Sequence, residues 1–272
     1  KLHPGLFPFI NLLPTYATVG QLGAPTYQDY LQQFLDAVDP SVLSFDHYAL
    51  LGPTGIRADY FQNWALVRQA ALAADVPSWV FILAMDHLGY RRPTPAELLW
   101  QVNVSLSYGC KCIQYFTYWR PAGDGWGQAL IDVDGNRTPQ YDHAKTINTT
   151  YLRPVGKQLL PLRSESVAHA NDAPLPAGAT AFTPDAYLAA IQGGAVIVSR
   201  FAAPRNTGAT RWLLVTNRGY DATTAATVTF TPAVQAVAEF DPSSRTYRPV
   251  RLDAHTTAVE LAAGAARLYR LR

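Results

Sequence analysis

Two pairs of an aspartate and a histidine, Asp46-His47 and Asp86-His87, are the residues of this sequence best suited to chemistry. A carboxyl group can donate or accept a proton, attack as a nucleophile or activate water, and a neighbouring imidazole can orient it. Two carboxyl groups acting together can serve one as an acid and the other as a base or a nucleophile. Asp46 and Asp86 are therefore catalytic candidates, and His47 and His87 are candidates to orient or assist them.

Aromatic and hydrogen-bonding residues accompany both pairs along the sequence. A sugar offers many hydroxyl groups to Asp, Asn, His and Arg, and a C–H face that Trp or Tyr can cover. The composition suits such a ligand, with 6 Trp, 15 Tyr and 11 Phe but only 4 Glu. A large aromatic core would use the same residues, so each of them also has a structural reading. The candidate substrate-binding residues are Asn11, Tyr16, Tyr48, Tyr118, Trp119, Arg120, Asp124 and Trp126.

A strand followed by a helix, repeated four times, positions these residues. Short apolar runs predict strands buried on both faces, and apolar residues at helical spacing predict the helices between them. The expected strands cover 6–13, 42–45, 79–83 and 112–116, and the expected helices cover 26–38, 57–75, a segment from 94, and 142–160. Chemistry in such proteins gathers where strands end. We therefore expect Trp119 and Trp126 to line one cleft with Asp46.

The fold class that follows is α/β. Strict alternation predicts a parallel sheet, and four units make either an open doubly wound sheet or half of an eight-stranded TIM (β/α)8 barrel. Residues 161–190 are rich in Pro, Ala and Ser and predict a linker after the α/β domain of residues 1–160. Short β-rich runs in residues 191–272 predict an antiparallel, sandwich-like all-β domain.

Several segments, in their order, resemble the C-terminal half of bacterial clan-A-like glycoside hydrolases of the β-galactosidase-related type. The resemblance covers about residues 3–160, and its main segments are 9–16, 43–48, 90–94, 107–109, 113–119, 129–132 and 138–141. It implies that the chain forms the last four βα units of a (β/α)8 barrel and hydrolyses O-glycosyl bonds of an oligo- or polysaccharide. It also implies an extracellular or periplasmic location.

The sequence departs from this family at its catalytic glutamates. Enzymes of the clan place an acid/base Glu after strand four, which falls outside this chain, and a nucleophilic Glu after strand seven, where this sequence offers Asp86. Glu97 is expected to cap a helix, and the other three Glu residues lie after residue 160. Two alternatives follow: a non-catalytic carbohydrate-binding remnant, or a fragment of a longer glycosidase, which the start at Lys1 favours. A second chain or a missing N-terminal half could complete the barrel.

Several function classes are disfavoured by composition. The net charge is +2 and no Lys/Arg stripe is present, which argues against nucleic-acid binding. No run of 18 apolar residues predicts a membrane span. Two Asp-His pairs forty residues apart are weak support for a metal site, and no cofactor is expected. Cys110 and Cys112 are too close in a strand to bridge each other readily and are read as small buried thiols.

Overall fold

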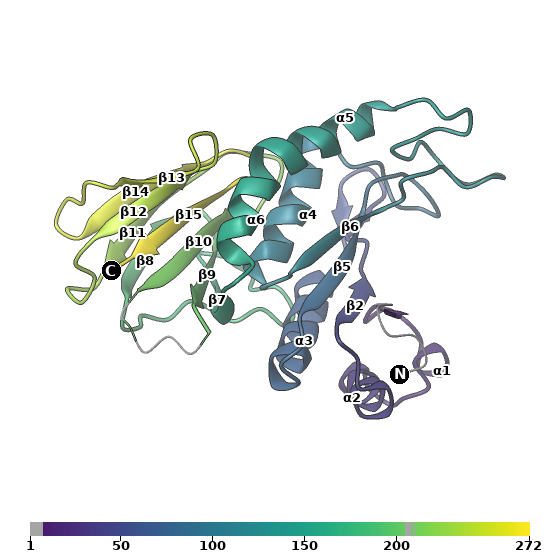
Figure 1. Cartoon of the computed structure of the whole chain (residues 1–272), viewed down its shortest axis with the longest axis horizontal. Helices are drawn as coiled ribbons and strands as arrows, with labels where there is room; N and C mark the ends of the chain where they lie inside the picture. The colour runs from purple at the N-terminus through teal and green to yellow at the C-terminus, as the bar shows by residue number, and fades with distance from the viewer. Residues whose placement is uncertain (1–7, 205–207, 209) are drawn as a thin grey trace.

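The computed structural model describes residues 8–204, 208 and 210–272, so the expected strand positions Leu6 and Phe7 lie outside the described residues. The protein has a mixed α/β fold. A parallel sheet with its helices forms one part, and several antiparallel strands form the other (Figure 1). Each helix in the described part of the chain is too short or too polar to cross a membrane.

The parallel sheet contains four strands in the order β1-β2-β5-β6. They are β1 (Asn11–Leu12), β2 (Leu43–Asp46), β5 (Ser78–Leu83) and β6 (Cys112–Phe116). Parallel pairing sets Phe45 beside Val80 and Val80 beside Ile113. Strand β1 is shorter than the predicted 6–13. Proline has no amide hydrogen for a sheet ladder, and Pro8 and Pro14 stand on either side of β1.

The helices are α1 (Val19–Leu22), α2 (Tyr27–Val38), α3 (Tyr60–Ala73), α4 (Pro95–Ser107), α5 (Pro139–Thr146) and α6 (Arg153–Leu159), with a π-helical turn, η1 (Ile147–Leu152), between the last two. The predicted capping box of α4 is present, because the Thr94 side chain accepts from the Glu97 amide and the Glu97 side chain accepts from the Thr94 amide. Helix α3 begins at Tyr60, three residues later than predicted, which leaves Arg57 in the preceding loop.

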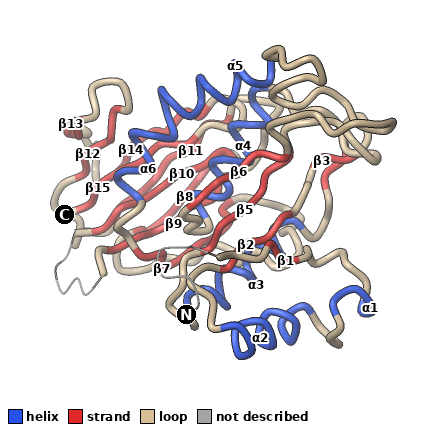
Figure 2. Tube along the Cα trace, turned by 45° about the vertical axis from the view of Figure 1, so that its right-hand side comes forward, coloured by secondary structure: helices blue, strands red, loops and turns tan. Residues whose placement is uncertain are grey.

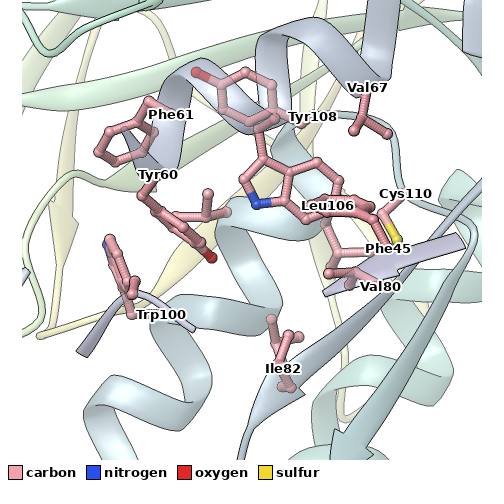
Figure 3. Close-up of a cluster of buried hydrophobic side chains, with 14 of the residues drawn as sticks. Phe45, Tyr60, Phe61, Val67, Val80, Ile82, Trp100, Leu106, Tyr108 and Cys110 are labelled. Carbon is pink, nitrogen blue, oxygen red and sulfur yellow. The ribbon is translucent and has the colours of Figure 1, made fainter. Parts of the chain in front are cut away.

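The hydrophobic core joins the parallel sheet to the antiparallel part. Aromatic side chains from α3 and α4 fill it (Figure 3), and Trp64 and Trp100 have no exposed surface. Trp64 meets Phe45 of β2 edge to face with ring centroids 4.8 Å apart. Trp100 donates from Nε1 to the Arg218 carbonyl at 3.0 Å. Helix α4 therefore packs between the parallel sheet and the antiparallel strands β9 (Val196–Ala202) and β10 (Arg211–Asn217).

The antiparallel part contains a six-stranded sheet, β13-β12-β15-β10-β9-β7, and a three-stranded sheet, β14-β11-β8. A separate two-stranded hairpin follows β2. The remaining strands are β3 (Leu50–Leu51), β4 (Gly55–Ile56), β7 (Arg163–Ala170), β8 (Leu188–Gly193), β11 (Thr224–Phe230), β12 (Val237–Asp241), β13 (Thr246–Pro249), β14 (Thr256–Leu261) and β15 (Ala266–Leu271).

The predicted linker over 161–190 was wrong for residues 163–170, which form β7. This strand pairs antiparallel with β9, from Arg163 opposite Ala202 to Ala170 opposite Val196. Its small and polar residues resemble a linker in composition. Pairing with β9 and burial of Ser164 and His169 make it a strand. The boundaries at 160 and 190 otherwise remain predictions.

Replacing Gly264 with alanine is expected to destabilise the fold by about 1–3 kcal/mol. Gly264 has a φ of +70°, and an added Cβ would lie 2.3 Å from the Ala96 carbonyl oxygen of α4. Gly23→Ala is the matched control, because Gly23 also has a positive φ but open space around its Cβ position. Urea unfolding of the two variants would show the difference. An equal loss of unfolding free energy in both variants would mean that α4 does not pack closely against the turn at Gly264.

Candidate functional site

The candidate site lies at the carboxyl ends of β2, β5 and β6, where the loops that follow these strands meet (Figure 2). The His87 and Trp126 backbones form an isolated bridge, and the Gly127 amide donates to the Asp86 carbonyl at 2.8 Å. These contacts join the loop after β5 to the loop after β6. Residues forty positions apart in sequence are thereby held side by side.

Asp46 is the last residue of β2, and a neighbouring amide holds its carboxylate. Asn11 Nδ2 donates to Asp46 Oδ1 at 2.6 Å. The Ser44 hydroxyl donates to Asn11 Oδ1 at 2.9 Å, which fixes the amide so that its NH₂ faces the carboxylate. Burial raises the pKa of Asp46 above its ordinary value, and the hydrogen bond from Asn11 partly opposes that rise. A carboxyl group with a raised pKa suits a general acid.

An aromatic wall, defined as Tyr16, Tyr48, His87, Tyr90 and Trp126, includes two phenols, those of Tyr16 and Tyr48, that lie within electrostatic range of Asp46. The Tyr48 ring lies 5.4 Å from His87 and 5.5 Å from Tyr90 between centroids, and His87 stacks on Trp126 at 5.4 Å. Burial raises the pKa of Tyr16 and of Tyr48, and the nearby Asp46 charge adds to both rises. Both phenols therefore stay protonated and can act as hydrogen-bond donors.

Asp86 follows β5 and is held by an arginine. Arg92 donates to Asp86 Oδ1 from Nε at 2.9 Å and from a terminal nitrogen at 2.8 Å. Gly127 packs on the same carboxylate so closely that a Cβ there would lie 2.1 Å from Oδ1. An open hollow of about 310 Å³ is lined by Asp86, His87, Leu88, Gly89, Tyr90, Gly125, Trp126 and Gly127. Asp86 and Trp126 are thus brought together.

The two histidines have different surroundings from those that the sequence suggested. His47 is buried, and its Nδ1 lies 2.8 Å from Asn63 Oδ1 while its Nε2 lies 3.6 Å from Asp59. Burial lowers the pKa of His47 to about 4. His87 is buried within the aromatic wall and its Nδ1 faces the Met85 carbonyl at 3.3 Å. These contacts fit rings that pack and support the site.

The other predicted substrate-binding residues of the loop after β6 differ in exposure and in contacts. Tyr118 and Trp119 are more than half exposed, and Trp119 lies along Ile131. Arg120 donates to the carbonyls of Gly123, Trp126 and Gly127, so its side chain holds the loop. Asp124 is exposed at the tip. A single cleft shared by Trp119, Trp126 and Asp46 stays a prediction.

Three residues of the site, Arg57, Tyr90 and Arg92, were not among the predicted site residues, although Tyr90 and Arg92 follow the predicted strand 79–83 closely. Tyr90 belongs to the aromatic wall and Arg92 binds Asp86. Tyr90 and Arg92 lie within the segment 90–94, which resembles the glycoside hydrolase family. That resemblance could have identified them as site residues. Arg57 carried no signal, because it was placed in a predicted helix.

A hollow of about 680 Å³ lies at the opposite end of the parallel strands. Ser78, Trp79 and Cys112 line it, and none of the candidate site residues does. Its Lys111 donates to the Leu159 and Leu162 carbonyls at the end of α6, and burial lowers the Lys111 pKa to about 8. These bonds give Lys111 a structural role.

The two cysteines are not among the candidate site residues, and Cys112 lines the hollow at the opposite end of the strands. Cys110 and Cys112 are free thiols, Cys110 is buried, and burial raises its pKa to about 12. Within residues 8–204, 208 and 210–272, no group of three or more His, Cys, Asp or Glu side chains could hold a metal ion.

Comparison with known proteins gives structural similarity alone. No protein-family model and no curated protein matches the sequence. The fold is similar to a glycoside hydrolase family 30 xylanase from Clostridium acetobutylicum (TM-score 0.38, 11% identity, 92% of this chain, 51% of that one). It is also similar to a family 44 xyloglucanase from Paenibacillus polymyxa (0.36, 10%, 90% and 50%) and a family 27 β-L-arabinopyranosidase from Geobacillus stearothermophilus (0.28, 11%, 93% and 62%).

The chain spans about half the length of the first two structures. Its function therefore has to be inferred from its own residues.

Proposed function

We propose that this chain is a glycoside hydrolase acting on an oligo- or polysaccharide, or the substrate-binding half of one, with its site at the carboxyl ends of the parallel strands. One observation carries the proposal: a half-buried carboxyl group, Asp46, is oriented by Asn11, and its charge reaches two tyrosines of the aromatic wall. Aromatic faces suit the C–H surface of a sugar, and an oriented carboxyl group with a raised pKa suits protonation of a glycosidic oxygen.

Asp46 is assigned the general acid, and Asp86 the second carboxylate that attacks carbon or activates water. Substrate contacts are assigned to Asn11, Tyr16, Tyr48, Tyr118, Trp119, Asp124 and Trp126. Arg120 acts by holding the loop that carries Trp126. The four parallel strands correspond in this proposal to half of an eight-stranded barrel, completed by a second half, and the antiparallel sheets to a sandwich-like domain. An extracellular or periplasmic location fits such an activity.

A second candidate function is carbohydrate binding without catalysis. The observation that favours it is the state of Asp86, whose carboxylate is tied to Arg92 and covered by Gly127. A group held in this way has little freedom to approach an anomeric carbon. The aromatic wall would serve binding equally well.

The test measures binding and hydrolysis on the same preparation. A panel of oligosaccharides is screened by calorimetry, and each ligand that binds is then incubated with the chain and analysed for reducing ends. Binding with hydrolysis supports the enzyme, and binding alone supports the second function. Absence of binding across the panel, with a cooperatively folded chain, would contradict both.

Replacing Trp119 with alanine is expected to weaken sugar affinity by about 1–3 kcal/mol, or roughly 5- to 150-fold, because an exposed indole face would be lost. Calorimetric titration measures the change. Trp212→Ala is the matched control, since Trp212 lies in the antiparallel part on β10. Affinity that is unchanged in Trp119→Ala would remove Trp119 from the site.

A further inference from the structure

Arg57 lies beside the aromatic wall and is held in a fixed position. Its guanidinium carbon stacks 3.7 Å from the centroid of the Tyr16 ring, and one terminal nitrogen donates to the Tyr90 hydroxyl at 3.0 Å. The Arg57 amide also donates to the Ala49 carbonyl at 2.8 Å. The charge is therefore presented by a rigid side chain, which reduces the entropy that a ligand would have to remove.

The hydrogen bonding of Arg57 is incomplete, in contrast to its neighbours at the site. Arg91 pairs with Glu97, Arg92 pairs with Asp86, and Arg120 donates to three carbonyls. For Arg57, the Tyr90 hydroxyl is the one hydrogen-bond acceptor found among the described residues, and its Nε is buried without a partner. A guanidinium has five N–H donors, so most of its capacity is unused.

The unused donors have a geometry that selects for a ligand. Stacking on Tyr16 fixes the guanidinium plane, and the Tyr90 hydroxyl takes one hydrogen of the terminal nitrogen Nη2. One hydrogen of Nη2 and both hydrogens of Nη1 have no acceptor among the described residues. The edge that Nη1 and Nη2 share matches the two oxygens of a carboxylate. Within the described part of the chain no carboxylate pairs with Arg57, and a half-buried cation in this state is the expected complement of an anionic ligand.

We propose that Arg57 is a specificity residue that binds the carboxylate of an acidic sugar, so that the substrate is a glycan containing uronic acid. This inference rests on the proposed function and specifies in addition that the substrate carries a negative charge. The carboxylate of the sugar would pair with the Arg57 guanidinium, which belongs to the segment between β2 and α3. The sugar ring would contact the aromatic wall.

The test uses immobilised oligosaccharides in matched sets that differ at C6 alone. Each set carries a free carboxylate, its methyl ester or the neutral hydroxymethyl group, on glucose, galactose and mannose residues. The wild-type chain is expected to bind the free acid of at least one set at least 10-fold more tightly than its ester. Arg57→Met should abolish this preference, and Arg57→Lys should retain part of it with greater sensitivity to salt.

Arg248→Met is the matched control for loss of one positive charge, because Arg248 is exposed on β13 in the antiparallel part. It should leave the preference unchanged. Circular dichroism and thermal unfolding would establish that each variant is folded. If Arg57→Met is unfolded, the role of Arg57 is tested by two remaining results. These are the preference of the wild-type chain for acid over ester and the partial loss of that preference in Arg57→Lys.

The outcomes separate the two proposals. Neutral members bound as tightly as acidic ones, or an acid preference that survives Arg57→Met, would overturn the role of Arg57 and leave the proposed function standing. No binding of any member by the wild-type chain would overturn both.

Discussion

Replacing Asp46 with asparagine is expected to lower glycoside hydrolysis by roughly 10²- to 10⁴-fold while sugar affinity changes little. The amide has nearly the shape of the carboxyl group but cannot protonate a leaving oxygen. Burial raises the pKa of Asp46 above its ordinary value, which favours the protonated form that a general acid needs. Asp86→Asn is expected to have an effect of similar size, because hydrolysis needs a second carboxylate.

The measurement is the turnover of a hydrolysed oligosaccharide, with affinity determined separately by calorimetry. Asp36→Asn is the control, since Asp36 is exposed on α2 and bonds to Gln32. Turnover that survives both substitutions at the site would place the catalytic groups elsewhere. A chain that binds sugar but never hydrolyses it would establish the non-catalytic function instead.

Stability is expected to fall as the solution is acidified, with His47 as a main cause. Asn63 Oδ1 accepts from the Thr15 amide, so the same oxygen faces Nδ1 of His47 and that nitrogen carries the proton. Burial lowers the His47 pKa to about 4 from its ordinary 6.5, and the nearby Arg57 charge lowers it further while Asn63 and Asp59 oppose the change. The folded protein therefore keeps this imidazole neutral.

The sign of the effect follows from which state binds the proton. The unfolded chain protonates His47 near pH 6.5, and the folded chain does so near pH 4. The contribution of neutral His47 to the free energy of unfolding is therefore complete above about pH 6.5 and is lost as the pH falls towards 4. The total loss is on the order of 3 kcal/mol. Burial also lowers the pKa of His87 and His169, which adds to the loss.

Urea unfolding at several pH values between 7.5 and 4.5 measures this dependence. In His47→Gln the slope of stability against pH should be smaller by about 1 kcal/mol per pH unit, because one proton fewer is taken up on unfolding. His255→Gln, in a turn of the antiparallel part, should keep the wild-type slope. Identical slopes in His47→Gln and wild type would show that His47 titrates normally in the folded chain.

Features set by neighbouring residues were predictable from the sequence. The start of α4 follows from Thr94, Pro95 and Glu97, because a capping box closes within three residues. The limits of β6 match the predicted 112–116, although its five residues are half-buried and not buried on both faces as expected. The position of Asp46 at the end of β2 could be read in the same way.

Features that depend on distant partners were not predictable. Thr15, Asn63 and His47 form one hydrogen-bonded group although they are 16 to 48 residues apart. Arg57 depends on Tyr16 and Tyr90 in the same way. Strand β7 exists because β9 pairs with it, and its own composition gives little sign of a strand.

Hydrogen exchange with and without a bound oligosaccharide would locate the site most directly. The ligand should slow exchange in the loops around Tyr48, His87 to Tyr90 and Trp119 to Trp126, at the carboxyl ends of β2, β5 and β6. Protection confined to the antiparallel sheets, or to the hollow around Trp79 and Lys111 at the opposite end of the strands, would contradict the proposed site.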